Sequence, residues 1–356
     1  TLFPYTTLFR STQAGTPSFG ASFIRDVIWV DWLKKFIAVG NAGKIAYSSD
    51  GNVWTQAATP SFSTTNVRSV CASDSLIVAF GESGKIAYST DGDVFTQVTT
   101  SAIGASDTMR AAIYIKELAL YVAAGEKFVT SNNGLDWEST AVPGSQVAVT
   151  SLSWSPELGL IVATGDRGEF FYSTSAQAWT LSASSPVGAD TLQSSVWSSA
   201  AARFVAVSSN GAAYSTNGTT WTAASALGVG DPVYTVHWFN EIGRFIAGVE
   251  TGDIIYSTDG DTWATAATPS FGGTEISASA HSGYLGRSVF VGDGGKIAYS
   301  TAFANTISAD VAGFTVQAVQ YSGTVTAYNC TMKQPGTTAN LSLNGCRVTE
   351  PDAHIS

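Results

Sequence analysis

Residues 43–54, Gly-Lys-Ile-Ala-Tyr-Ser-Ser-Asp-Gly-Asn-Val-Trp, return along the chain at an almost constant interval. The tyrosine of this stretch recurs at spacings of 41, 42, 42, 42, 42 and 43 residues, with a threonine in the third copy. The recurring positions are Tyr47, Tyr88, Thr130, Tyr172, Tyr214, Tyr256 and Tyr299. Self-similarity at a fixed period indicates a repeat architecture in which each copy is one supersecondary unit. The sequence therefore predicts seven equivalent units.

Each period contains four short runs typical of β-strands. In the first copy these runs are Val27–Val30, Phe36–Val39, Lys44–Ser48 and Trp54–Ala57. An Asp-Gly pair lies between the last two runs, and such a pair is a strong hairpin signal because both central residues of that turn take positive φ. Four strands in about 42 residues are the signature of a propeller blade, and a ring of blades leaves only short sheet edges. The predicted fold class is all-β, a seven-bladed β-propeller of four-stranded blades.

The two ends of the repeat region complement each other. After Tyr299 the last copy has neither the Asp-Gly turn nor the tryptophan, so it lacks a fourth strand. Residues 13–19, Gln-Ala-Gly-Thr-Pro-Ser-Phe, nearly repeat residues 56–62, which hold a fourth strand and its exit loop. We therefore expect residues 12–16 to close the ring by pairing with the strand around Lys296–Ser300.

The remaining segments define three predicted parts of the chain. Residues 1–11 contain no initiating Met and resemble a translated sequencing adapter. We expect this segment to be non-native and the true N-terminus, with any targeting signal, to be missing; whether upstream blades or a signal peptide preceded the ring is left open. Residues 12–313 form the predicted propeller. Residues 314–356 break the period and predict a C-terminal β segment, either a small complete element or the start of a further domain, with Phe314–Tyr321 and Thr324–Asn329 as a hairpin.

Composition excludes several classes of function. Hydrophobic residues make up 44% of the chain and charged residues only 12%, so the chain can bury a large core and is not disordered. No uncharged apolar run approaches the roughly 18–20 residues that a spanning helix needs. The net charge of −10 disfavours a surface that binds phosphate backbones. We therefore expect neither membrane insertion nor a nucleic-acid partner.

The repeated turns resemble the Asp-box of bacterial neuraminidase repeat proteins, and equally the blades of photosystem II assembly-factor-like propellers. Ser48–Trp54 and Ser257–Trp263 carry this resemblance best. The usual box has one residue between Asp and Gly, whereas the two are adjacent here, and residues 175–177 of the fourth copy are degenerate. Similar repeats occur in phage structural proteins and bacterial surface proteins. The resemblance covers about residues 12–303 and implies a propeller whose boxes are structural. The box residues are Asp50, Gly51, Trp54, Asp91, Gly92, Asn133, Gly134, Trp137, Asn217, Gly218, Trp221, Asp259, Gly260 and Trp263.

Six basic residues form the candidate binding site. Lysines begin the third strands of blades 1, 2 and 7, and arginines lie at or just before the first strands of blades 1, 2 and 3. They are Lys44, Lys85, Lys296, Arg25, Arg68 and Arg110. Because the loops that carry them open on the same face of a propeller, we expect one basic sector that binds a carboxylated or sulfated glycan. The alternative is that they are solubilising surface charges; the basic residues of the first-to-second strand turn are interpreted as scaffold. These are Lys35, Arg203, Arg244 and Arg287.

No catalytic residue, metal site or cofactor is predicted. The three histidines are scattered and form no ligand cluster, and His237 and His281 lie at or beside an inner-strand tryptophan position. Each box turn offers at most two carboxylates, fewer than the six to eight oxygen ligands that calcium prefers. Cys71 fits a buried strand position. Cys330 and Cys346 either pair in an oxidising compartment or remain thiols.

Three functions are considered on these grounds. The first is a non-catalytic binding or structural module, extracellular on a virion or cell surface, whose loops on one ring face recognise a glycan or protein partner. The second is a sialidase-like glycoside hydrolase, which needs an arginine cluster, a tyrosine nucleophile and acids; residues 23–26, Phe-Ile-Arg-Asp, do not match the Arg-Ile-Pro start of that family. The third is a protein-binding propeller like the photosystem assembly factors. The oligomeric state is not indicated.

Overall fold

The computed structural model describes residues 11–14, 18–58, 62–144, 147–183, 185–225, 227–240, 242–266, 271–300, 330–333 and 340–343. The chain divides into two compact units, residues 1–301 and 302–356. In the second unit β29 (Cys330–Lys333) pairs antiparallel with β30 (Asn340–Leu343). The predicted hairpin of residues 314–329 and Cys346 lie outside the described residues. No described helix is long and apolar enough to cross a membrane.

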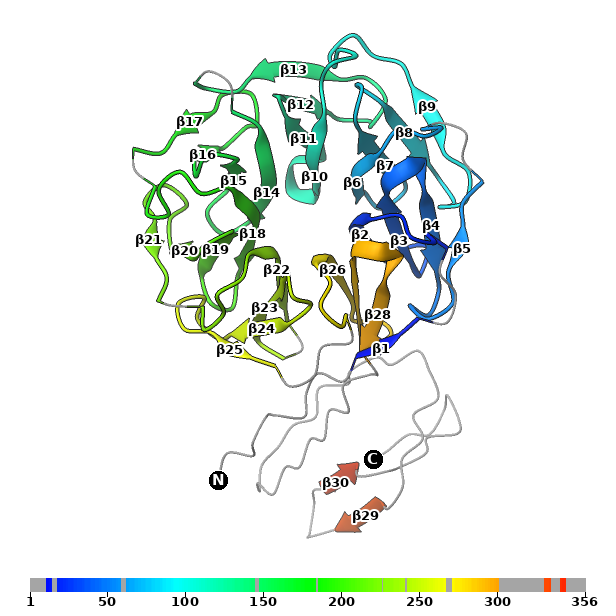
Figure 1. Ribbon diagram of the computed structural model, residues 1–356, viewed down its shortest axis with the longest axis vertical. Coiled ribbons are helices and arrows are strands. Elements are labelled where there is room, and N and C mark those ends of the chain that lie inside the picture. The colour runs from blue at the N-terminus through cyan, green and yellow to red at the C-terminus, as the bar shows by residue number, and fades with distance from the viewer. Residues whose placement is uncertain are drawn as a thin grey trace. The chain divides into compact units, whose positions relative to one another are not determined.

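Seven four-stranded antiparallel sheets surround a central axis in the first unit (Figure 1), which confirms the predicted all-β, seven-bladed propeller. Each sheet runs from an inner strand beside the axis to a short outer strand at the rim. Blade 1 comprises β2 (Ile24–Val30), β3 (Lys35–Gly40), β4 (Ile45–Ser48) and β5 (Thr55–Gln56); blade 2 comprises β6 (Val67–Ala72), β7 (Ile77–Gly81), β8 (Ile86–Ser89) and β9 (Thr96–Val98). Blade 3 comprises β10 (Met109–Ile115), β11 (Leu120–Gly125), β12 (Lys127–Ser131) and β13 (Glu138–Ala141); blade 4 comprises β14 (Val149–Ser155), β15 (Leu160–Gly165), β16 (Phe170–Ser173) and β17 (Thr180–Leu181).

The remaining blades repeat the same pattern. Blade 5 comprises β18 (Leu192–Ser198), β19 (Arg203–Ser208), β20 (Ala212–Ser215) and β21 (Thr222–Ala223); blade 6 comprises β22 (Val233–Phe239), β23 (Arg244–Val249), β24 (Ile254–Ser257) and β25 (Ala264–Thr265). Blade 7 comprises β26 (Ile276–Ser282), β27 (Arg287–Gly292), β28 (Ile297–Ser300) and, as its outer strand, β1 (Ser11–Gln13). Short 3₁₀ turns lie at Asn41–Gly43, Lys116–Leu118 and Asp293–Gly295.

The N-terminal strand closes the ring as the sequence predicts. Thr12 of β1 lies opposite Tyr299 of β28, the same register in which Thr55 lies opposite Tyr47 in blade 1. The strand is shorter than the predicted 12–16 and begins at Ser11, inside the segment interpreted as non-native. Blade 7 is therefore assembled from both ends of the ring.

The Asp-Gly turn works differently from the predicted hairpin. In blade 1, six residues connect β4 to β5, and only Gly51 of the pair has positive φ (+74°). One oxygen of Asp50 accepts the backbone N–H groups of Asn52 and Val53, each at 2.8 Å. The Trp54 indole N–H donates to the Gly51 carbonyl at 3.0 Å. The aspartate thus caps an Asx-type turn, and the tryptophan is fixed at its end.

The core consists of apolar layers between neighbouring blades. In blades 5 and 7 the predicted scaffold arginines also join these layers: Arg203 donates to the carbonyl of Asp259 in blade 6, and Arg287 donates to that of Asp50 in blade 1. The Arg287 guanidinium lies over the ring of Tyr299, with 4.6 Å between its central carbon and the ring centroid. Because Arg287 joins blade 7 directly to blade 1, ring closure does not depend on β1 alone.

Candidate functional site

A β-bulge at the second residue of every inner strand builds one mouth of the central channel. The register of all seven inner pairs shifts at this residue, which has no partner on the second strand. A bulge re-aims its side chain away from the regular pleat. The seven bulge residues are Arg25, Arg68, Arg110, Thr150, Gln193, Tyr234 and Ser277. Together with Phe23 and Glu275 they line one cavity of about 270 Å³.

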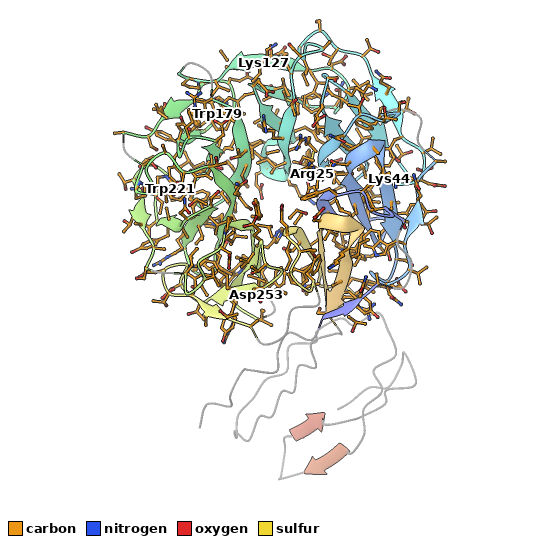
Figure 2. The ribbon with its side chains drawn as sticks, viewed as in Figure 1. Arg25, Lys44, Lys127, Trp179, Trp221 and Asp253 are labelled. Carbon is orange, nitrogen blue, oxygen red and sulfur yellow. The ribbon has the colours of Figure 1, made fainter. Side chains whose placement is uncertain are left out.

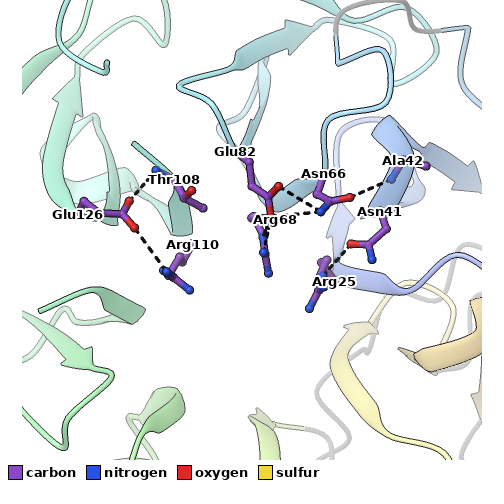
Figure 3. Close-up of polar contacts among 9 residues, drawn as sticks. All are labelled: Arg25, Asn41, Ala42, Asn66, Arg68, Glu82, Thr108, Arg110 and Glu126. Atoms are coloured by element: carbon purple, nitrogen blue, oxygen red, sulfur yellow. Dashed lines mark hydrogen bonds and ion pairs between the residues drawn. The ribbon is translucent and has the colours of Figure 1, made fainter. Parts of the chain in front are cut away.

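The structure brings the three predicted arginines together at this mouth (Figure 3). Each arginine is held by the turn that joins the second and third strands of its own blade. Arg25 Nε donates to Asn41 Oδ1 at 3.0 Å, and Arg68 Nε donates to Glu82 Oε1 at 2.8 Å. Arg110 Nη2 lies 3.4 Å from an oxygen of Glu126. The guanidinium groups are therefore oriented before any ligand binds.

These contacts leave donors free for a ligand. Among the described residues, Arg25 forms a hydrogen bond through Nε only, and its guanidinium also lies 4.2 Å from the centre of the Phe23 ring. Both Nη groups of Arg25 therefore remain available at the cavity. Arg68 pairs with Glu82 through Nε and Nη2 and keeps Nη1. Arginine forks match carboxylate and sulfate oxygens, so the mouth can bind an anion beside blades 1–3.

Among the lining residues of the mouth, Glu275 is acidic and lies in blade 7, next to blade 1 with Arg25. Burial raises the pKa of Glu275 to about 7; Arg25 opposes this shift, whereas Asp293 and Glu250 add to it. Burial also lowers the pKa of Arg25, as does Arg68, while Glu275 raises it. The charge of the mouth therefore changes near neutral pH, and it becomes more positive as Glu275 takes up a proton.

The structure places the three predicted lysines elsewhere. Each ammonium group donates to the carbonyl of a phenylalanine in the linker that precedes its blade: Lys44 to Phe19 at 2.7 Å, Lys85 to Phe62 at 2.9 Å, and Lys296 to Phe271 at 2.5 Å. Figure 2 shows Arg25 beside the central opening and Lys44 farther out in its blade. The lysines do not line the described cavity and brace the linkers instead.

Below the mouth, the inner strands enclose a channel of about 390 Å³ with mostly hydroxyl-bearing polar residues. The carboxylate of Asp26, a half-buried residue, accepts hydrogen bonds from the Ser69 hydroxyl at 2.9 Å and the Val70 N–H at 3.0 Å. Burial raises the pKa of Asp26, and these bonds oppose the shift. They join blades 1 and 2, so the polar lining satisfies the free edges of the inner strands.

His237 lines the channel, and part of its surface is accessible from the lumen. The surrounding strands nevertheless keep its ring away from bulk water. This desolvation, together with nearby His281, lowers the pKa of His237 to about 4. Within the described residues, no group of three or more His, Cys, Asp or Glu side chains forms a metal site. Cys71 is a buried free thiol in its strand.

Sequence reasoning missed six residues of the mouth, which are Phe23, Thr150, Gln193, Tyr234, Glu275 and Ser277. A usable signal existed for four of them. The arginines of blades 1–3 all stand second in an inner strand, so the same position in the other blades identifies Thr150, Gln193, Tyr234 and Ser277. Phe23 and Glu275 each precede an inner strand and are recognised only from the cavity that they line.

Comparisons with known proteins show the fold. No family model and no curated protein matches the chain. A solved structure of YCF48 from Cyanidioschyzon merolae is 17% identical with a TM-score of 0.65, covering 82% of this chain and 98% of its own. YCF48 bound to a D1 peptide is 15% identical with a TM-score of 0.66, covering 84% and 97%. A catalytically inactive virginiamycin B lyase from Staphylococcus aureus with quinupristin is 11% identical with a TM-score of 0.71, covering 82% and 99%. At these identities the likeness establishes the β-propeller fold alone.

Proposed function

We propose that the propeller is a non-catalytic binding module that recognises an anionic segment of a protein partner at the arginine-lined mouth. One observation carries this proposal: bulges in three consecutive inner strands aim Arg25, Arg68 and Arg110 into a single cavity. A solved propeller of the same architecture is described as bound to a peptide, which supports a protein partner for this chain. A carboxylated or sulfated glycan presents the same chemistry, so the test includes one.

Two labelled probes test the site, acetyl-hexaglutamate amide and a heparin-derived hexasaccharide, with binding followed by fluorescence anisotropy. We expect saturable binding of the acidic peptide, and at least a tenfold loss when Arg68→Gln and Arg110→Gln are combined, because two fork-shaped donors leave the cavity. Lys34→Gln is the matched control. Lys34 is an exposed base in the β2–β3 turn, where it pairs with Asp31. Unchanged binding by the double variant would overturn the proposal, and binding of the hexasaccharide alone would shift it to a glycan.

Sialidase-like hydrolysis is a second candidate, because Tyr234 and Glu275 line the same cavity as the three arginines. This set contains the tyrosine, the acid and the arginine cluster that such chemistry uses. Burial raises the pKa of Tyr234, followed by Glu275 and Glu250, which makes its hydroxyl a poorer nucleophile at neutral pH. Hydrolysis of a fluorogenic sialoside that Tyr234→Phe abolishes would establish this activity; no release of fluorophore by the intact chain would dismiss it.

The proposal also includes a location, which is the surface of a virion or a cell. It rests on the resemblance of the repeated Ser-x-Asp-Gly turns to Asp-box repeats of surface and phage structural proteins, together with a rigid ring that presents variable loops. Sequencing the intact gene and its neighbours tests this part, because adjacent tail or capsid genes are expected for a virion protein. Neighbouring genes of photosystem assembly would instead favour the assembly-factor alternative.

A further inference from the structure

The linkers between blades carry an apolar plug at a fixed place. Six of the seven junctions have an apolar residue five or six positions before the next inner strand, and five of these six residues are buried and one is half-buried. The plugs are Phe19, Phe62, Ile103, Val187, Leu227 and Phe271. The same place is thus filled by the chain itself at these junctions.

Phe62 shows how a plug fits. It packs with Val39 and Ile45 of blade 1 in one buried cluster. A glycine of each neighbouring blade lies against Phe62, where a larger residue would crowd it. A Cβ built on Gly81 would lie 2.9 Å from Phe62 Cε1, and one built on Gly43 would lie 3.3 Å from Phe62 Cβ. A plug of this kind therefore occupies a preformed slot between two blades.

Among the described residues, which leave out 145 and 146, the junction between blades 3 and 4 has no such plug five or six positions before β14. Gly144 stands five residues before β14, has a φ of +91°, and would place a Cβ in open space with nothing within 4 Å. Glu126 alone separates β11 from β12, whereas four residues separate β3 from β4. Val147 reaches part of the slot, since its Cγ1 lies 2.9 Å from a Cβ built on Gly165. A cleft of about 600 Å³ remains.

The cleft is lined by both apolar and charged residues, and Glu126 and Asp166 are among the charged ones. Val142, Val147 and Ala148 contribute apolar surface, and β13 forms one side with Ser139, Thr140 and Ala141. Arg110 lines this cleft and also the arginine-lined mouth. Lys127 also lines the cleft and pairs with Asp107 at 2.8 Å. The two cavities are therefore neighbours that share one guanidinium group.

We infer that this cleft takes one large apolar side chain, aromatic or aliphatic, from the protein partner whose anionic group binds at the mouth. The inference rests on the proposed function. The occupant is argued from the chain's own junctions, where phenylalanine, isoleucine, valine or leucine on a peptide linker fills the corresponding slot. A partner segment with a carboxylate near a phenylalanine or leucine fits both cavities at once, because Arg110 lies at their boundary. Burial of the apolar group adds affinity that the arginines cannot supply.

Two uncharged probes test the cleft in the full chain, N-acetyl-phenylalanine amide and N-acetyl-alanine amide. Binding is read from NMR shifts of the Val142 and Val147 methyl groups. We expect saturable shifts with the phenylalanine probe and at least tenfold weaker binding of the alanine probe. Ala141→Trp places an indole at the cleft edge and is expected to weaken the phenylalanine probe tenfold or more. Ala264→Trp, at an exposed alanine in β25, is the matched control and should bind as the parent does.

Equal binding of the two probes, or no binding of either, overturns the inference even if the acidic peptide still binds at the mouth. Because this comparison uses the unaltered chain, it holds whether or not Ala141→Trp folds. Full binding by a folded Ala141→Trp variant also overturns it. Shifts with the phenylalanine probe in a chain that binds no acidic peptide would overturn the proposed function and leave the cleft as an apolar site.

Discussion

Phe62→Ala removes the plug from the junction between blades 1 and 2, at the position that Gly144 holds in the junction between blades 3 and 4. The Phe62 side chain is fully buried, and its carbonyl accepts the Lys85 ammonium group at 2.9 Å. The substitution removes the ring and keeps that backbone acceptor. The change therefore isolates the contribution of the plug from that of the lysine brace.

The expected loss of unfolding free energy is about 3–5 kcal/mol, the range for phenylalanine-to-alanine changes in cores. The slot is bordered by the backbone of Gly43 and Gly81, which cannot move inward as a flexible side chain could, so collapse is limited. Val147→Ala is the matched control at the junction without a plug. Because Val147 is only half-buried and loses two methyl groups, about 1 kcal/mol is expected.

Urea unfolding followed by tryptophan fluorescence measures both values. Domains are usually stable by about 5–15 kcal/mol, so the Phe62→Ala loss should lower the midpoint clearly with an unchanged slope. A loss below about 1 kcal/mol, or one equal to that of Val147→Ala, would refute the idea that the plugs stabilise the blade junctions. The basis for a vacant slot beside Gly144 would then also be lost.

Three further outcomes are expected. Ala176→Gly should stabilise the chain by about 0.5–1 kcal/mol in urea unfolding, because this buried residue has a φ of 60° where blades 1, 2, 3, 5 and 6 have glycine; a loss would contradict this. Removing residues 1–13 should lower the melting temperature, since β28 then loses its outer partner; an unchanged value would show that Arg287 closes the ring alone. For His237 the folded pKa is about 4 against an ordinary 6.5, so between these values the unfolded chain binds more protons and stability falls as pH falls. The free energy of unfolding in urea, measured at several pH values between 4 and 6.5, should fall less steeply with falling pH in His237→Gln than in the parent. Identical pH profiles of the two chains would contradict the lowered pKa of His237.

The repeat predicted most of the fold because its period is strictly local information. Tyr47 and its counterparts mark the third strand of every blade, and Thr12 takes the register of Thr55 at the closing strand. The turn geometry was only partly predicted. Asp50 was expected at positive φ, but its carboxylate instead accepts two backbone N–H groups, a contact that a residue pattern does not distinguish from a two-residue hairpin.

The candidate site was predicted in part for a similar reason. Arg25, Arg68 and Arg110 share a position in their strands, so the ring brings them together. Lys44 and Lys85 also share a position, yet each reaches back to a phenylalanine carbonyl about 23–25 residues earlier, across a blade junction. A lysine at the start of a strand looks like a surface charge in the sequence, and only packing between blades reveals its bond.

The number of blades, the order of strands within each blade and the pairing that closes the ring can be derived from the amino-acid pattern, because each follows from a motif that returns about every 42 residues. The lining of the mouth and the packing of each blade junction cannot be derived in full from that pattern. Both depend on contacts between blades, because a bulge redirects the Arg110 side chain and because the space beside Gly144 is bordered by residues of two different blades.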